Sequence, residues 1–167
     1  MTTQNVRGFD AGEWPLYREL RLKALADSPD SFGGTWTEEK DRPEEEWSTR
    51  LKEWTTSPDC HAMLALAGGK PAGLLFARLE GEDQRNVHLY SMWIDPLFRR
   101  AGLGGLLVSS VVAWSRQRAA QVLHLRVAEK NSAAIGLYER IGFRRTSERA
   151  PLRESSSQFA IAMEMKL

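Results

Sequence analysis

The chain has one cysteine, almost no net charge and no long apolar run among its 167 residues. A single thiol, Cys60, cannot form a disulfide within the chain and fits a reducing compartment. No apolar stretch approaches the roughly 18 residues of a membrane span, and the N-terminus lacks a basic-then-apolar signal pattern. A net charge of +1 gives no overall attraction for nucleic acid or for a membrane. We therefore expect a cytoplasmic protein that partners with neither.

Two local absences bear on individual sites. Cys60 and His61 are neighbours, but no further ligands cluster around them, so we expect no metal site. Carboxylates are missing from Pro96 to Ala128, although five arginines lie there: Arg99, Arg100, Arg116, Arg118 and Arg126. Such one-sided charge suits a polyanionic ligand. Nucleic acid would also suit it, but no aromatic-plus-basic reading pattern accompanies the arginines.

The remaining composition is that of an ordinary globular protein, with 42% hydrophobic and 27% charged residues. A chain of 167 residues can bury most of its apolar surface, and neither an internal repeat nor a low-complexity linker divides it. We expect one domain over residues 1–167.

Hydrophobic periodicity and capping residues predict mixed helices and strands. In the first half we expect a strand over residues 4–9, a helix from Trp14 to about Asp27, a second helix capped by Asp41 with Glu44, and a hairpin of His61–Leu66 and Ala72–Leu79. In the second half we expect strands over Val122–Val127, from Phe143, and over Phe159–Leu167 (inserted in the sheet), with a helix from Asn131 to Gly142.

Two segments of the first half have an open interpretation. The loop Ser31–Thr37 combines two glycines with Phe32 and Trp36, which suits either a closure over substrate or a plain connector. The run Glu38–Glu46 is strongly acidic, which suits either solvation of a helix N-terminus or a rim that attracts a cationic amine.

One stretch in the middle organises the chain. A β-branched and aromatic strand over Val87–Ile94 ends at Pro96, and a helix begins at about Gly102 with apolar residues at helical spacing. Between them lie Arg99 and Arg100, which are unfavourable beside a helix N-terminus unless an anion sits between them and the free N–H groups. The alternative is an ordinary glycine turn with two solvated arginines. A Walker loop is absent, and Leu107 stands where a dinucleotide fingerprint needs glycine or alanine.

The residual pattern Arg-x-x-Gly-x-Gly, from Arg99 to Gly104, follows Asp95-Pro96 and resembles the acetyl-CoA-binding motif of the GNAT N-acetyltransferase superfamily. The segment Asn131–Phe143 is similar to the family's second motif, Asn-x-x-Ala-x-x-Leu-Tyr-x-x-x-Gly-Phe. The two motifs stand in the family's order and spacing, and together they cover residues 87–143, about a third of the chain.

The resemblance implies an α+β fold: a largely antiparallel, six- or seven-stranded sheet flanked by about four helices, with a splayed central strand pair. It implies acetyl-CoA as cosubstrate, without a metal. By motif position, the residues expected to bind it are Met92, Trp93, Ile94, Arg99, Arg100, Ala101, Gly102, Leu103, Gly104, Asn131 and Tyr138. Tyr138 also matches the family's usual acid for the leaving thiolate, although helical periodicity by itself favours a core tyrosine.

Both family positions for a basic carboxylate hold other residues here. Arg126 stands where acetyltransferases of ribosomal-protein N-termini have a glutamate, and the central strand reads His88-Leu89-Tyr90-Ser91 where other members have one. This weakens a peptide N-terminus as acceptor.

Three routes for deprotonating the amine stay open. They are a histidine base, a carboxylate acting through water, or an amine already neutral in solution; the residues concerned are His88, His124, Glu129, Glu80, Glu82 and Asp83. Because His124 and Arg126 alternate onto one strand face, we expect that arginine to lower the histidine pKa. We therefore expect a water-relayed or substrate-controlled step.

The function implied is an acetyl-CoA-dependent N-acetyltransferase acting on a primary amine of a small molecule or peptide by direct attack in a ternary complex. A homodimer is left open. The alternative from another class is a non-catalytic acyl-CoA-binding regulatory module, which the missing carboxylates would favour.

Overall fold

In residues 2–167, which the computed structural model describes, seven strands form one sheet in the order β1-β2-β3-β4-β5-β7-β6. The strands are β1 (Gln4–Gly8), β2 (Cys60–Ala67), β3 (Lys70–Glu80), β4 (Asn86–Ile94), β5 (Val122–Ala128), β6 (Arg144–Pro151) and β7 (Phe159–Lys166). The helices are α1 (Trp14–Asp27), α2 (Trp36–Glu39), α3 (Glu44–Thr56), α4 (Leu103–Gln117) and α5 (Ser132–Ile141), with 3-10 turns η1 (Ala11–Glu13) and η2 (Pro96–Phe98). The predicted α+β fold is confirmed, and the helix beyond the expected four is the single turn α2.

The sheet is antiparallel except between its two central strands. β4 and β5 run parallel, whereas the pairs β1-β2, β2-β3, β3-β4, β5-β7 and β6-β7 are antiparallel. A parallel pair requires a crossover, and α4 provides it. β7 lies between β5 and β6, which confirms the predicted insertion of the C-terminal strand.

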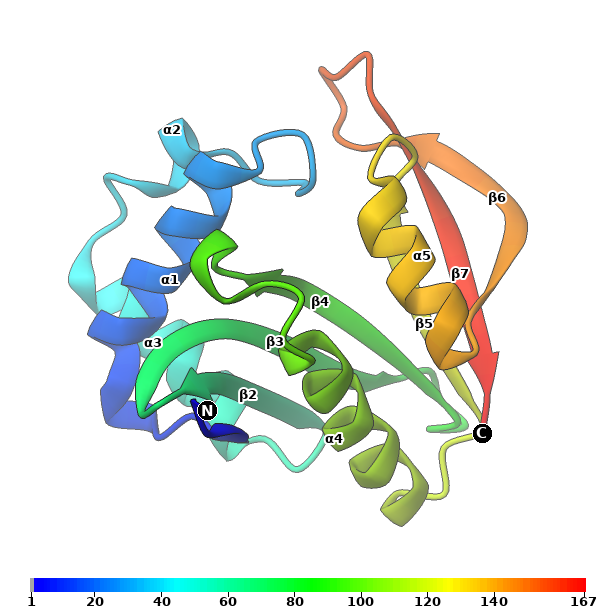
Figure 1. Cartoon of the computed structure of the whole chain (residues 1–167), viewed down its shortest axis with the longest axis horizontal. Coiled ribbons are helices and arrows are strands. Elements are labelled where there is room, and N and C mark those ends of the chain that lie inside the picture. The colour runs from blue at the N-terminus through cyan, green and yellow to red at the C-terminus, as the bar shows by residue number, and fades with distance from the viewer. Residues whose placement is uncertain (1) are drawn as a thin grey trace.

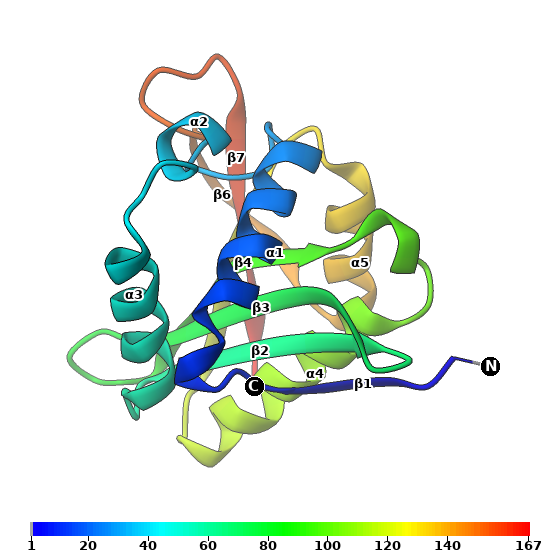
Figure 2. The same ribbon diagram turned by 90° about the vertical axis from the view of Figure 1, so that its left-hand side faces the viewer.

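Helices cover both faces of the sheet (Figures 1 and 2). α4 and α5 pack on one face over a core that includes Leu107, Val111, Leu123 and Phe143. α1 and α3 pack on the other face of β2, β3 and β4, where Trp47 is fully buried. Each large apolar side chain removed from water in these cores contributes about 1.5–3 kcal/mol of transfer free energy. β3 and β4 contribute side chains to both cores, while β5, β6 and β7 carry α5 on one face.

The predicted second helix is wrong in its start. Asp41 caps nothing; α2 begins after Thr35, whose side chain accepts a hydrogen bond from the Glu38 N–H in a capping box, and α3 begins after Pro43. A helix capped by Asp41 would place Arg42 in its first turn directly before a proline, where the helical conformation is sterically disfavoured.

None of the helices in residues 2–167 combines the length and apolar character needed to cross a membrane.

Candidate functional site

The two central strands diverge after three residue pairs. The paired residues are Asn86, Val87 and His88 of β4 with Val122, Leu123 and His124 of β5. Within residues 2–167, β4 and β5 form no further pairs beyond His88 and His124. The predicted splay of the central pair is therefore present. A cavity of about 1030 Å³ lies at this fork, lined by the ends of both strands, the start of α4, one face of α5 and the loop after α1.

A bulge in β4 lies on the edge of the fork. Tyr90 pairs with Phe76 and Trp93 with Leu74, so two residues of β4, Ser91 and Met92, stand opposite one residue of β3. Ser91 has a left-handed backbone, with φ of 57°. Such a bulge interrupts the ladder and turns the following backbone. The bulge therefore frees the main chain around Met92 from sheet pairing and turns it where the cavity begins.

The turn before α4 has the backbone features expected of an anion site. Arg100 and Gly102 have φ of 62° and 88°, and the first bond of the helix runs from the Leu106 N–H to the Gly102 carbonyl. The preceding N–H groups at this helix start have no partner within the helix, and the helix dipole is positive there. A Cβ on Gly104 would stand 2.9 Å from Leu137 and 3.1 Å from Met92, so glycine allows α4 to start against both.

Arg99 lies at the cavity but is already engaged. Its Nε donates to the Ile94 carbonyl at 2.8 Å, and its Nη2 donates to Asp27 Oδ2 at 2.5 Å. The same Asp27 oxygen accepts from Trp93 Nε1 at 2.9 Å and from the Ser28 hydroxyl at 2.8 Å. Hydrogen bonds from these donors hold the Asp27 pKa below its usual value in spite of opposing desolvation. Asp27 thus ties the end of α1 to both β4 and the arginine turn.

Helix α5 presents two predicted residues to the cavity. Asn131 caps it, accepting from the Ala134 N–H at 3.1 Å, and its amide nitrogen lies 3.5 Å from the Ser31 hydroxyl. Tyr138 lines the cavity and is 7% exposed, packed edge-to-face on Phe143 at 5.7 Å between ring centroids. Burial raises the Tyr138 pKa, so its hydroxyl stays protonated at neutral pH. Both interpretations of this tyrosine hold together: it is a core residue, and it borders the cavity.

Of the residues predicted to bind the cofactor, all but Ala101 line the cavity: Met92, Trp93, Ile94, Arg99, Arg100, Gly102, Leu103, Gly104, Asn131 and Tyr138.

The candidate bases lie apart from this set. The imidazoles of His88 and His124 stack at 4.8 Å on the last paired residues of the fork, and neither lines the cavity. Burial and then the His88 charge lower the His124 pKa; the predicted cause was wrong, because Arg126 is exposed and lies 3.4 Å from Glu148. Glu129 is paired with Arg149 at 3.0 Å, which lowers its pKa.

Near these histidines, Glu80 accepts a hydrogen bond from the Tyr90 hydroxyl at 2.5 Å. The same carboxyl group lies 3.8 Å from His88 Nε2, measured at its other oxygen. The polar cluster that results lies outside the lining of the cavity.

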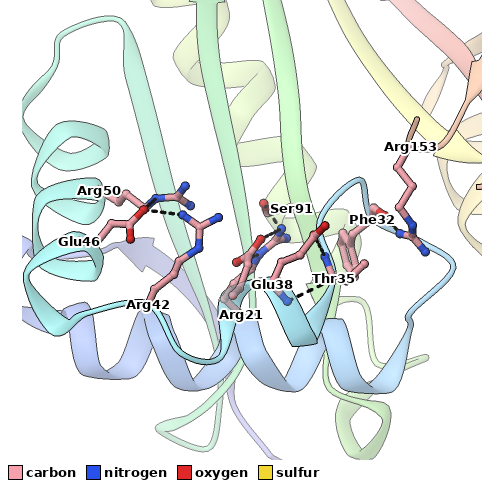
Figure 3. Close-up of polar contacts among 10 residues, drawn as sticks. Arg21, Phe32, Thr35, Glu38, Arg42, Glu46, Arg50, Ser91 and Arg153 are labelled. Atoms are coloured by element: carbon pink, nitrogen blue, oxygen red, sulfur yellow. Dashed lines mark hydrogen bonds and ion pairs between the residues drawn. The ribbon is translucent and has the colours of Figure 1, made fainter. Parts of the chain in front are cut away.

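The acidic run Glu38–Glu46 does not form one continuous rim. Glu39 is buried in a two-point ion pair with Arg21, at 2.9 and 3.1 Å. Glu46 accepts from Arg42 at 2.6 Å, as Figure 3 shows. Glu38 caps α2. Structural contacts thus account for Glu38, Glu39 and Glu46, whereas Asp41, Glu44 and Glu45 are exposed, so half of the six acidic side chains have structural roles.

Sequence reasoning missed two residues beside the cavity. Asp27 reads as a helix stop, and Arg21 as one more charge on an amphipathic helix, because neither belongs to a motif. Their partners are far away in the chain: Trp93 and Arg99 for Asp27, Glu39 and Ser91 for Arg21. The loop after α1 carried one usable signal, since Phe32, noted for its aromatic character, lines the cavity.

The sequence and the fold of the chain are both similar to those of known proteins. The model of the acetyltransferase (GNAT) family matches residues 22–143. Mycothiol acetyltransferase of Thermobispora bispora is 32% identical over 147 residues, which are 84% of this chain and 46% of that protein. A [ribosomal protein bS18]-alanine N-acetyltransferase of Salmonella typhimurium is 40% identical over 55 residues, 33% of this chain and 37% of that protein. The chain spans about half the length of the mycothiol acetyltransferases that it matches.

Among solved structures, an acetyltransferase of the GNAT family from Streptococcus pneumoniae superposes with a TM-score of 0.79 and 19% identity. The match covers 99% of this chain and 100% of that one. At this identity the likeness establishes the fold.

Proposed function

The chain belongs to the acetyltransferase (GNAT) family, and on that premise we propose that it moves an acetyl group from acetyl-CoA to a primary amine of a small molecule or peptide. We further propose direct attack of the amine in a ternary complex. The observation that carries the proposal is the forked β4-β5 pair, which opens into a cavity of about 1030 Å³ lined by the start of α4.

The lining of the cavity fits a long polyanionic thioester. The lining includes the start of α4, with its free N–H groups, and the cationic side chains of Arg100, Lys130 and Arg140. It also includes apolar and aromatic residues, among them Met92, Phe98, Leu103 and Leu137. The volume lies at the upper end of the ~300–1,000 Å³ typical of ligand sites.

Each part of the cavity has a distinct task in this proposal. The turn Arg99–Gly104 and the first N–H groups of α4 bind the diphosphate. The backbone of Met92–Ile94, turned by the bulge, donates to and accepts from the amide-bearing arm. When bound, acetyl-CoA supplies an electrophilic acetyl carbon on a sulfur leaving group. Tyr138 Oη holds the proton that this sulfur needs, and its raised pKa keeps the proton in place until it is required.

The acceptor must lose a proton before it attacks. Neither His88 nor His124 borders the cavity, and Glu129 is exposed and forms an ion pair with Arg149. We therefore propose that the proton leaves through water, or that the enzyme takes the neutral amine from solution. The names of the relatives support an amine acceptor but no particular compound.

The direct test measures free thiol released from acetyl-CoA over a broad panel of amines, together with the acetylated product. Turnover with at least one amine is the expected result. Binding of CoA with no turnover over the whole panel would favour the non-catalytic acyl-CoA-binding module. That module is the second candidate because Arg126 and the stretch His88–Ser91 lack the family carboxylates.

A further inference from the structure

Arg21 is the centre of a buried polar network beside the cavity. Its Nε and Nη2 donate to the two oxygens of Glu39 at 3.1 and 2.9 Å. The side chains are 12% and 5% exposed, so this two-point contact is shielded from water. A buried ion pair adds little net stability, because desolvation offsets its Coulomb attraction, but its geometry holds both groups in fixed positions. The guanidinium is therefore locked before any ligand arrives.

The remaining edge of the guanidinium faces the bulge. Arg21 Nη1 donates to the Ser91 hydroxyl at 3.3 Å, and Figure 3 shows the two side chains meeting between α1 and β4. Ser91 is the left-handed residue of the bulge, with φ of 57°. A left-handed serine costs free energy and persists only where its surroundings impose it. The Arg21 contact is such a restraint, and it acts one residue before Met92.

The same guanidinium contacts the loop that forms the opposite wall. It lies over the Phe32 ring at 5.2 Å from the centroid, and a Cβ on Gly34 would stand 2.4 Å from the Glu39 carboxylate. From the other side, Arg153 donates to the Phe32 carbonyl at 2.7 Å and to the Pro29 carbonyl at 3.0 Å. The loop after α1 is thus held between two arginines, with Arg21 also holding the bulge.

We propose that Arg21 is a positioning residue for acetyl transfer. Through Ser91 it fixes the bulge that turns the Met92–Ile94 backbone toward the thioester, and through Phe32 it fixes the facing wall of the cavity. This inference rests on the proposed function. Misplacement of reacting groups by about 1 Å can cost ~10²-fold in rate, so the loss of one weak contact at this position can reduce turnover strongly.

Ser91→Gly separates a positioning role from a structural one. Glycine adopts the left-handed conformation freely and has no hydroxyl, so the variant should melt at an unchanged or higher temperature. A purely structural serine would then leave turnover intact. Positioning predicts that kcat falls about tenfold, because the bulge is no longer restrained, while the Kd for CoA weakens by clearly less than kcat falls, because the diphosphate contacts of the turn before α4 are untouched.

Ala119→Gly is the matched control. Ala119 is also left-handed, with φ of 56°, and is exposed in the turn between α4 and β5. Its replacement relieves the same backbone cost away from the cavity and should leave kcat unchanged.

Arg21→Lys tests the route of the effect. Lysine keeps the charge beside Glu39 but lacks the planar fork that reaches Glu39 and Ser91 together. If Arg21 acts through Ser91, the double variant Arg21→Lys/Ser91→Gly loses no more kcat than the more impaired single variant.

Acetyl transfer by the wild type, calorimetric binding of CoA and thermal melting are measured in parallel. A wild type without turnover on any amine contradicts the proposed function itself. An active wild type with equal kcat in Ser91→Gly and Ala119→Gly overturns the positioning role, and so do additive losses in the double variant.

Discussion

A carboxylate introduced at Gly105 should weaken cofactor binding strongly without a steric effect. Gly105 is the third residue of α4 and lines the cavity, and no atom lies within 4 Å of the position of a Cβ. Gly104 is less suitable, because a Cβ there would lie only 2.9 Å from Leu137 and 3.1 Å from Met92. A steric effect could then not be separated from the effect of the charge. An acidic residue in the first turn stabilises a helix by about 0.3–1 kcal/mol, so Gly105→Asp should fold at least as stably as the wild type.

The loss of affinity can be bracketed from Coulomb's law. Two like charges about 4 Å apart repel by ~1 kcal/mol in water and ~4 kcal/mol at the effective dielectric constant of a protein surface. Screening by salt reduces this, and we expect a cost of about 1.5–3 kcal/mol, or roughly 10- to 100-fold weaker binding of CoA. At a CoA concentration ~100 times the wild-type Kd, ligand stabilisation would fall from ~2.7 kcal/mol to ~0.4 kcal/mol for a 100-fold loss.

Gly105→Asn is the matched control, because asparagine has the size of aspartate without its charge. Thermal shifts with CoA, with Kd values from calorimetry at two salt concentrations, compare the pair. We expect the asparagine variant to keep the shift and the aspartate variant to lose it, more so at low salt. Equal Kd values for the two variants would refute the placement of the diphosphate at the start of α4.

Three further predictions follow from the site and from the core. Tyr138→Phe keeps the packing against Phe143 and should retain CoA affinity while kcat falls by ~10²–10⁴-fold in steady-state assays; a normal kcat would leave the tyrosine a core residue. His61, bonded to Ser110 and stacked on Trp114, has its pKa lowered from 6.5 to about 4 by burial and then by Arg118. Between these two pH values the imidazole is protonated in the unfolded chain and neutral in the folded one. The contribution of His61 to the free energy of unfolding is therefore complete above pH 6.5 and is lost as the pH falls to about 4. After allowance for solvent screening, the free energy of unfolding measured in denaturant titrations should fall by about 1–2 kcal/mol over this pH range. This fall should be absent in His61→Phe. For two amines whose pKa values differ by about two units, kcat/KM should rise with pH toward each amine's own pKa; a common break between ~6 and ~7.5 that disappears in His88→Ala or His124→Ala would instead show a histidine base.

Local sequence signals predicted the elements around the cofactor site well. Pro96 ends β4, Gly102 precedes α4, and Asn131 and Gly142 bound α5, because each acts through its own backbone preference or a contact within one turn. The splay of β4 and β5 came from the family resemblance, since no periodicity within either strand shows where two strands stop pairing, and their parallel direction was not predicted.

Contacts between distant segments could not be predicted in this way. The bulge at Ser91 depends on the register with β3, which local composition does not encode. Glu39 looked like part of an exposed acidic run, yet the short turn α2 directs it at Arg21, 18 residues earlier in the chain. Asp41 looked like a helix cap until Pro43, two residues later, decided where α3 could start. In each case a tertiary or steric constraint outweighed the local pattern.

The central claim is acetyl transfer to an amine at the β4-β5 fork. The ratio of free thiol to acetylated amine, measured in the same sample, tests it most directly. The wild type is incubated with acetyl-CoA and the most reactive amine of the panel, and free thiol and acetylated amine are quantified together, with Tyr138→Phe and Gly105→Asp as references. We predict equal amounts of thiol and acetylated amine from the wild type, formed much more slowly by both variants. Thiol release without acetylated amine, or equal rates in all three proteins, would contradict the account.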